Sequence, residues 1–299
     1  MRISTQILFE SGAASMGEVQ SSLFKTQQQV SSGRRILTAA DDPVGAARAL
    51  EVTQSQSLNA QYGVNRQHAK SALSEVEVTL SSVTELLQDV RTTTIAAGNG
   101  TLTDTERGFM ATELSARRDQ LLGLANSRDG MGNYMFSGFQ TDTPAFSKDA
   151  LGVVSYDGDA GQRLIQVDAS RQMSATAPGS TVFQGGGQDV FDTLNDLIAL
   201  LQTPGMPSAV DLGTATTNVD LALDNILTVR ASVGSRLQEL DALDYAGEDR
   251  NLQYSQTLSE LQDLDYTTAL TQLSQQQVTL EAAQRTFVTI SGLSLFNFL

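Results

Sequence analysis

Residues 62–94, YGVNRQHAKSALSEVEVTLSSVTELLQDVRTTT, decide the fold class of this 299-residue chain. Their apolar side chains recur in steps of three and four, which is the spacing of one face of an α-helix. This seam consists of Leu73, Val76, Leu80, Val83, Leu87 and Val90. The same register extends back through Ala69, Arg66 and Tyr62 and forward to Thr94. The glycines at 98 and 100 are then expected to end the helix. The stretch therefore predicts a long helix with a coiled-coil seam.

More helices are expected further along the chain. Asp104 is expected to cap a helix that has Glu106 in its first turn and an apolar face of Met110, Leu114, Leu121 and Leu124. A short helix is expected at about 190–201, before a loop that contains the prolines at 204 and 207. The long helix after this loop has Arg230 in register with a seam of Val219, Leu223, Ile226, Val233, Leu237 and Leu240.

Residues 130–188 differ in character from the helical segments on either side. Gly and Pro become frequent, the helical period disappears, and short runs at 153–156 and 164–167 are rich in strand-forming residues. This segment predicts a small β-rich insertion.

The two ends of the chain carry matching heptad stripes. One stripe is Phe9, Met16, Leu23 and Val30, and the other is Tyr266, Leu273, Leu280 and Phe287, continued by Ile290. Gln, Ser and Thr surround both stripes. Such narrow stripes bury too little to offset an ordering entropy of about 1–2 kcal/mol per residue. We therefore expect the two terminal helices to be ordered by partners when subunits assemble.

Together these patterns predict a mainly α protein: a long antiparallel helical bundle or coiled coil from both termini, with a small β-rich inserted domain. Three domains are expected. Terminal helices occupy 1–42 and 260–299, a helical bundle occupies 43–129 and 189–259, and the β-rich domain occupies 130–188.

The connector after the first terminal helix is dense in structural signals. Gly33 can end that helix with a left-handed residue, and Asp42 followed by Pro43 is typical of a helix start. The charges of Arg34, Arg35 and Asp41 are then left for ionic contacts between neighbouring subunits, or they are solvated charges of a turn. The sequence leaves both interpretations open.

Composition excludes several classes of function. The formal net charge is -15 and only three lysines are present, which argues against a nucleic-acid partner. No cysteine and a single histidine exclude thiol chemistry, disulfides and Cys/His zinc sites. No stretch is long and apolar enough for a membrane span, and the first residues lack the apolar core of a secretory signal. Other proteins are the expected partners.

Candidate catalytic and metal-binding residues are few. His68 lies off the helical seam without a neighbouring triad arrangement, so we interpret it as a solvated or interhelical residue. The run 157–161, DGDAG, lacks the remaining ligands of a calcium loop and is interpreted as a turn between strands. The glycines at 185–187 lack the Lys-Ser/Thr of a phosphate-binding loop. We expect no enzyme activity, no cofactor and no metal.

Several motifs resemble those of a known superfamily. VSSGRRI at 30–36 and ADDPVGAA at 40–47 resemble the N-terminal signature of bacterial flagellins, and 270–299, ending SLFNFL, resembles their terminal helix. Within the superfamily, GNYMFSG at 132–138, followed by TDTPAF at 141–146, is similar to the hook-associated protein 3 family, as is the opening MRIST. The resemblance covers essentially the whole chain.

The resemblance implies a function. Members of that family are extracellular structural subunits of the bacterial flagellum, exported unfolded by the flagellar type III apparatus without a cleaved signal peptide. It implies four partners: hook-associated protein 1, flagellin, further copies in a ring, and an export chaperone. The terminal helices would pair into the inner tube of a helical assembly. The residues expected to take part in assembly, on these helices and in the connector, are Phe9, Met16, Leu23, Val30, Arg34, Arg35, Asp41, Leu273, Leu280, Phe287, Ile290, Leu293, Phe296 and Leu299. A flagellin with a shortened middle domain and a secreted type III coiled-coil protein are the alternatives.

Overall fold

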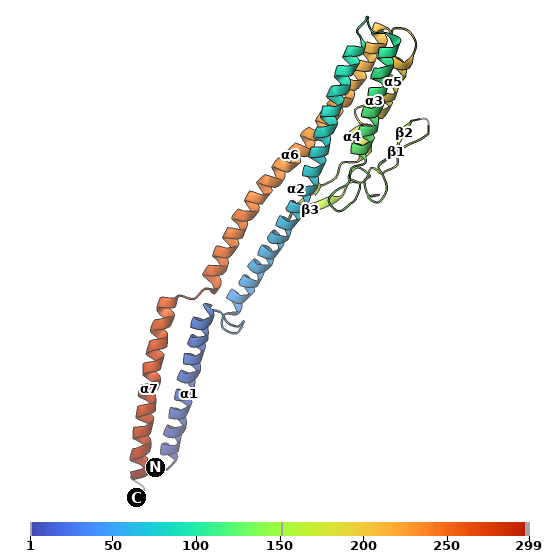
Figure 1. Ribbon diagram of the computed structural model, residues 1–299. Coiled ribbons are helices and arrows are strands. Elements are labelled where there is room, and N and C mark those ends of the chain that lie inside the picture. Colours follow the sequence, from blue (N-terminus) through green and yellow to red (C-terminus); the bar gives the residue numbers. More distant parts are fainter. Residues whose placement is uncertain (1, 151, 297–299) are drawn as a thin grey trace. The chain divides into compact units, whose positions relative to one another are not determined.

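A computed structural model describes residues 2–150 and 152–296, with the side chains of residues 7, 9–150 and 152–289. It confirms the mainly α fold class (Figure 1). The helices are α1 (Arg2–Ser32), α2 (Pro43–Ala97), α3 (Asp104–Ala125), α4 (Gly179–Phe183), α5 (Val190–Gln202), α6 (Ala209–Gln262) and α7 (Tyr266–Phe296). The strands are β1 (Phe146–Lys148), β2 (Val154–Tyr156), β3 (Leu164–Asp168) and β4 (Arg171–Ser174).

Contacts within the chain define two compact units. The central unit is Asn59–Glu248, and the terminal unit combines the residues up to Leu58 with those from Asp249 onward. The long helices α2 and α6 each contribute to both units. The β-rich segment packs within the central unit. The division into three domains stays a prediction.

The predicted seam forms part of the core of the central unit, which also includes residues of α3, α5 and the β-rich segment. All six apolar seam residues of 62–94 are at most 2% exposed on α2. They face α6, where Val219, Ile226, Val233 and Leu240 are at most 1% exposed, while Leu223 and Leu237 are partly buried. Arg230, the polar member of the α6 seam, donates to Glu77 Oε1 on α2 at 2.7 Å. Periodicity alone therefore located this core, because neighbouring turns of a long helix share one face.

The start of α3 differs from its prediction. Thr103 caps the helix: its Oγ1 accepts from Glu106 N at 3.3 Å, and Glu106 Oε2 accepts from Thr103 N at 2.7 Å. In this reciprocal capping box the capping residue stands three residues before the glutamate. Thr103 has that position relative to Glu106, whereas Asp104 is only two residues before it. Asp104 instead pairs with the buried Arg107. The prediction that Asp104 is the cap was wrong by one residue.

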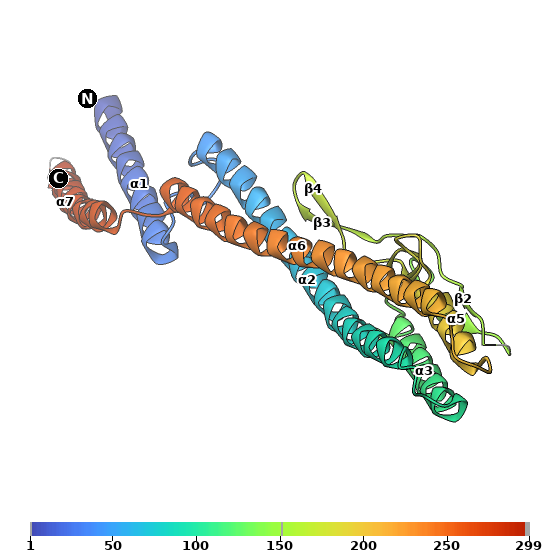
Figure 2. The same cartoon turned by 90° about the horizontal axis from the view of Figure 1, so that it is seen from above.

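Two antiparallel hairpins form the β-rich segment (Figure 2). In the first, β1 pairs with β2 so that Phe146 lies opposite Tyr156. In the second, β3 pairs with β4 so that Leu164 lies opposite Ser174, with an irregularity between Gln166 and Asp168. Phe146 and Tyr156 of the first hairpin join a cluster of aromatic rings whose contacting centroids lie 5.1–6.0 Å apart. Its other members are Phe136, Phe183 and Phe191, and all but Tyr156 are buried. The predicted strands at 153–156 and 164–167 are confirmed as β2 and β3.

Candidate assembly surface

The two terminal helices pack against each other within the chain. The rings of Phe9 on α1 and Phe287 on α7 lie 4.5 Å apart between centroids. Further along, Gln276 Nε2 donates to Ser22 Oγ at 2.8 Å. These pairs fix an antiparallel arrangement, in which residue numbers rise on one helix as they fall on the other. The predicted stripes thus meet in one chain, and whether the helices order only on assembly stays a prediction.

The predicted assembly residues of the two helices lie in or beside this contact. Met16, Leu23, Val30, Leu273, Leu280 and Phe287 are partly buried, and Phe9 keeps 44% of its surface exposed. The side chains of Ile290, Leu293 and Phe296 on α7 lie outside the described residues, and so does Leu299. Their role in assembly stays a prediction, since it concerns contacts with other chains.

The connectors that follow α1 and precede α7 are hydrogen-bonded to each other. Gly33 adopts φ +71°, the left-handed geometry that glycine tolerates best, and its N–H donates to Gln29 O at 2.9 Å. Gly33 O accepts from Leu264 N at 3.0 Å, and Arg35 N donates to Gln262 O at 2.7 Å. The predicted end of the first helix at Gly33 is confirmed. The connector also buries Ile36, so it has a small core of its own.

The charged connector residues are engaged mainly inside the chain. Asp41 Oδ1 lies 2.6 Å from Lys25 Nζ, and Asp41 Oδ2 accepts from Thr38 N at 2.9 Å. The hydrogen bond from Lys25, with those from the backbone, lowers the pKa of Asp41 to about 2. Arg35 pairs with Asp42 at 3.2 Å and donates to Leu261 O at 2.9 Å. Their contacts with neighbouring subunits remain predictions.

Asp42 performs the predicted helix start. Its Oδ1 accepts from Gly45 N at 2.9 Å, and α2 begins at the next residue, Pro43. This hydrogen bond from Gly45 is the largest cause that lowers the pKa of the Asp42 carboxyl. Arg34 is exposed, and among the described residues its guanidinium has no ion pair. It is the connector charge that the chain leaves open to an external acid.

A second set of apolar side chains lies off the stripes and stays exposed after the helices pair. The heptad pattern did not predict this set, because its members fall between the stripe positions. Apolar residues outside the stripe positions were the sequence signal that could have revealed it. Each member is at least half exposed. The set, called the outward apolar set below, is Ile7, Phe24, Leu270, Val278 and Val288. Where exposed apolar groups form a contiguous patch, they mark surfaces that bind other proteins.

The terminal helices are also electrically neutral. Helix α1 contains two basic and two acidic residues, and α7 contains one of each, although the whole chain carries -15. Little like-charge repulsion therefore opposes bringing several copies of this helix pair together. The acidic charge is concentrated in the rest of the chain.

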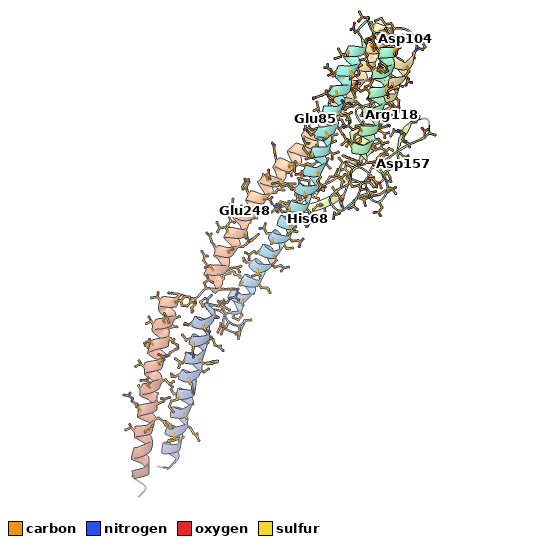
Figure 3. All side chains as sticks on the ribbon, viewed as in Figure 1. His68, Glu85, Asp104, Arg118, Asp157 and Glu248 are labelled. Atoms are coloured by element: carbon orange, nitrogen blue, oxygen red, sulfur yellow. The ribbon has the colours of Figure 1, made fainter. Side chains whose placement is uncertain are left out.

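The residues considered for catalysis and metal binding lie in ordinary surroundings in the described part of the chain. No group of three His, Asp or Glu side chains among them could hold a metal ion. His68 is exposed on α2 (Figure 3). Asp159 Oδ1 accepts from Phe139 N at 2.9 Å and Gly161 N at 2.7 Å, which is the behaviour of a turn residue. Within the same described part, no helix is long and apolar enough to cross a membrane.

Comparisons with known proteins agree with this architecture. The model of the bacterial flagellin N-terminal helical region matches residues 3–141. Flagellar hook-associated protein 3 of Escherichia coli K12 is 36% identical over an alignment of 317 positions, gaps included. The alignment covers 99% of this chain and 99% of that protein. The chain therefore belongs to the flagellar hook-associated protein 3 family, whose members are structural components of the flagellum.

Solved structures show the same fold. A flagellar hook-associated protein from Vibrio parahaemolyticus is 29% identical, with a TM-score of 0.68 over 75% of this chain and 100% of that one. The flagellar junction protein FlgL from Legionella pneumophila has a TM-score of 0.61 at 22% identity, over 72% of this chain and 100% of that one. The second likeness supports the fold alone.

Proposed function

We propose that this chain is a junction subunit that joins the hook of a bacterial flagellum to its filament. The observation that carries the proposal is the 36% identity to a hook-associated protein 3 along 99% of both chains. The terminal helices supply a physical reason, because their pair is neutral and keeps apolar side chains exposed. Both properties suit helices that become buried between copies.

The proposed partners follow from this position. Hook-associated protein 1 would lie on the hook side, flagellin on the filament side, and further copies of the chain beside it in a ring. We place the terminal helices at the inside, where the stripe residues and the outward apolar set would contact neighbours. The protein would act outside the cell after export by the flagellar type III apparatus with an export chaperone. Its role would be mechanical rather than catalytic.

Electron microscopy of cells tests the proposal. A strain of the source organism without this chain should make hooks that lack filaments and should shed flagellin into the medium. A plasmid copy of the full chain should restore filaments, whereas a copy that lacks residues 270–299 should not. Filaments that remain attached in the deletion strain would refute the junction role.

Labelling distinguishes the main alternative. The family model that matches residues 3–141 is shared with flagellins, so a flagellin with a shortened middle domain is the second candidate. Gold-labelled antibodies against the chain should mark a single band where hook and filament meet. Label distributed along the filament would favour the flagellin alternative.

A further inference from the structure

The seam between α2 and α6 loses its apolar residues at one end of the central unit. Within the central unit, Ala69 is the last buried apolar residue of α2 in this direction, and the next seam position holds Arg66. On α6 the positions beyond Leu240 hold Asp244 and Gly247. Apolar burial therefore does little to hold the two helices together here.

The polar residues at this end are buried nonetheless. The Arg66 side chain is 4% exposed and forms an ion pair with Asp244, which is 22% exposed. Nearby, Asn59 Nδ2 donates to Gly247 O at 2.8 Å. A buried ion pair is stable only while water stays out and its remaining donors are satisfied. Something must keep this end closed.

The β3–β4 hairpin is hydrogen-bonded to both helices at this level. On the α2 side, Asn65 Nδ2 donates to Gln166 O at 2.8 Å, and Arg66 Nη1 donates to Val167 O at 3.1 Å. On the α6 side, Arg171 forms a two-point contact with Glu239, with N–O distances of 2.6 and 2.9 Å. The two side chains stay 53% and 35% exposed, so this two-point contact is directional but only modestly stabilising.

The inner face of the hairpin is apolar. Val167 is fully buried and Met173 is 3% exposed, and both belong to the same core as Ala69 and Leu240. The hairpin thus supplies, from a distant part of the sequence, the apolar cover that the helices lack at this point. Its polar anchors lie at its edges and its apolar residues lie over the seam.

We propose that the β3–β4 hairpin is a strap that holds α2 and α6 closed around the buried Arg66–Asp244 pair. The stability of this end of the helix pair then depends on the few side-chain contacts that the strap makes. Releasing its tip from α6 should let residues 59–70 and 241–248 open to solvent, while the apolar seam at 76–90 stays closed.

Hydrogen exchange of the full chain, read by mass spectrometry, tests the strap. Arg171→Glu sets the new acid against Glu239 and beside Asp168, its strand partner. Peptides from 59–70 and 241–248 should then exchange about three- to tenfold faster, with 76–90 unchanged. The charge swap Arg171→Glu with Glu239→Arg should restore slow exchange. Arg91→Ala removes an α2–α6 ion pair with Asp220 that does not involve the hairpin, so it serves as the control and should leave 59–70 protected.

The unchanged protection of 76–90 shows in the same experiment that the single variant is folded. Parent-like exchange of 59–70 and 241–248 in Arg171→Glu would overturn the proposal. So would a charge-swapped variant that exchanges as fast as the single variant, because the tip contact would then not be what holds the strap.

Discussion

Replacing Gly247 with alanine should destabilise the central unit, even though alanine is the better helix former. Gly247 lies inside α6, where a Gly→Ala change ordinarily gains about 0.5–1 kcal/mol. However, a Cβ at this position would stand 2.5 Å from Arg66 Nη2 and 3.3 Å from Arg66 Cζ. The guanidinium would have to move.

The magnitude follows from what holds that guanidinium. Arg66 is buried, pairs with Asp244 and donates to Val167 O. Breaking a buried ion pair by removal of one partner costs about 3–5 kcal/mol, because the other charge is left buried. Displacing the guanidinium should therefore cost a large part of this ~3–5 kcal/mol. After subtraction of the helix-propensity gain, we expect a net loss of about 1–4 kcal/mol.

Urea unfolding of the full chain, followed by far-UV circular dichroism, measures this change. Gly234→Ala is the matched control, because it lies in the same helix and its added Cβ meets nothing within 4 Å. It should stabilise by about 0.5–1 kcal/mol. In an Arg66→Ala background, Gly247→Ala should behave like this control, since the obstructing group is gone. A Gly247→Ala variant that is stabilised as much as Gly234→Ala would refute the reasoning.

Three further predictions concern the terminal unit. The pKa of Asp41 is lowered from 3.8 to about 2, so its charged form stabilises the connector above about pH 4 and this stabilisation is lost as the pH falls from 3.8 toward 2. By NMR, the connector amides should lose protection, measured against their intrinsic exchange rate, over this window. Asp41→Asn should abolish this pH dependence, and a profile that the substitution leaves unaltered would contradict the prediction. Gly33→Ala should cost about 1–2 kcal/mol in thermal unfolding, because Gly33 has φ +71°; parent-like stability would argue against strain there. Phe287→Ala should lower the helicity of the monomer, because it removes the contact with Phe9, which stabilises the helix pair by about 2 kcal/mol. Val278→Ala should leave monomer helicity unchanged but reduce the number of flagellated cells. A loss of helicity in Val278→Ala, with none in Phe287→Ala, would contradict this assignment.

Much of the fold can be predicted from residues that are close together in the sequence. The seam of α2 was found from its period because residues three and four apart share a helix face, and Leu73, Leu80 and Leu87 are indeed buried. Gly33 and Asp42 were found because left-handed geometry and helix capping depend on one residue and its nearest neighbours. The cap of α3 was missed by one position because Thr103 and Asp104 are both good caps.

The partners of charged groups could not be found in this way. Heptad reasoning placed Arg66 in the seam but gave no reason for it, since Asp244 lies 178 residues away. Lys25 was not expected to pair with Asp41, because the connector must first fold back on α1. The bonds of the β3–β4 hairpin to both α2 and α6 could not be predicted either. These contacts depend on distances in space that no spacing along the chain encodes.

The sequence by itself determined the helices, their apolar faces, the connector and the family, because each depends on residue types at short spacing. Only the tertiary structure decided which faces remained exposed after α1 and α7 paired, and which residues closed the polar end of the central seam. A side chain such as Val278 is apolar in either case. Whether it is core or surface is settled by what packs against it, and packing joins residues from opposite ends of the chain.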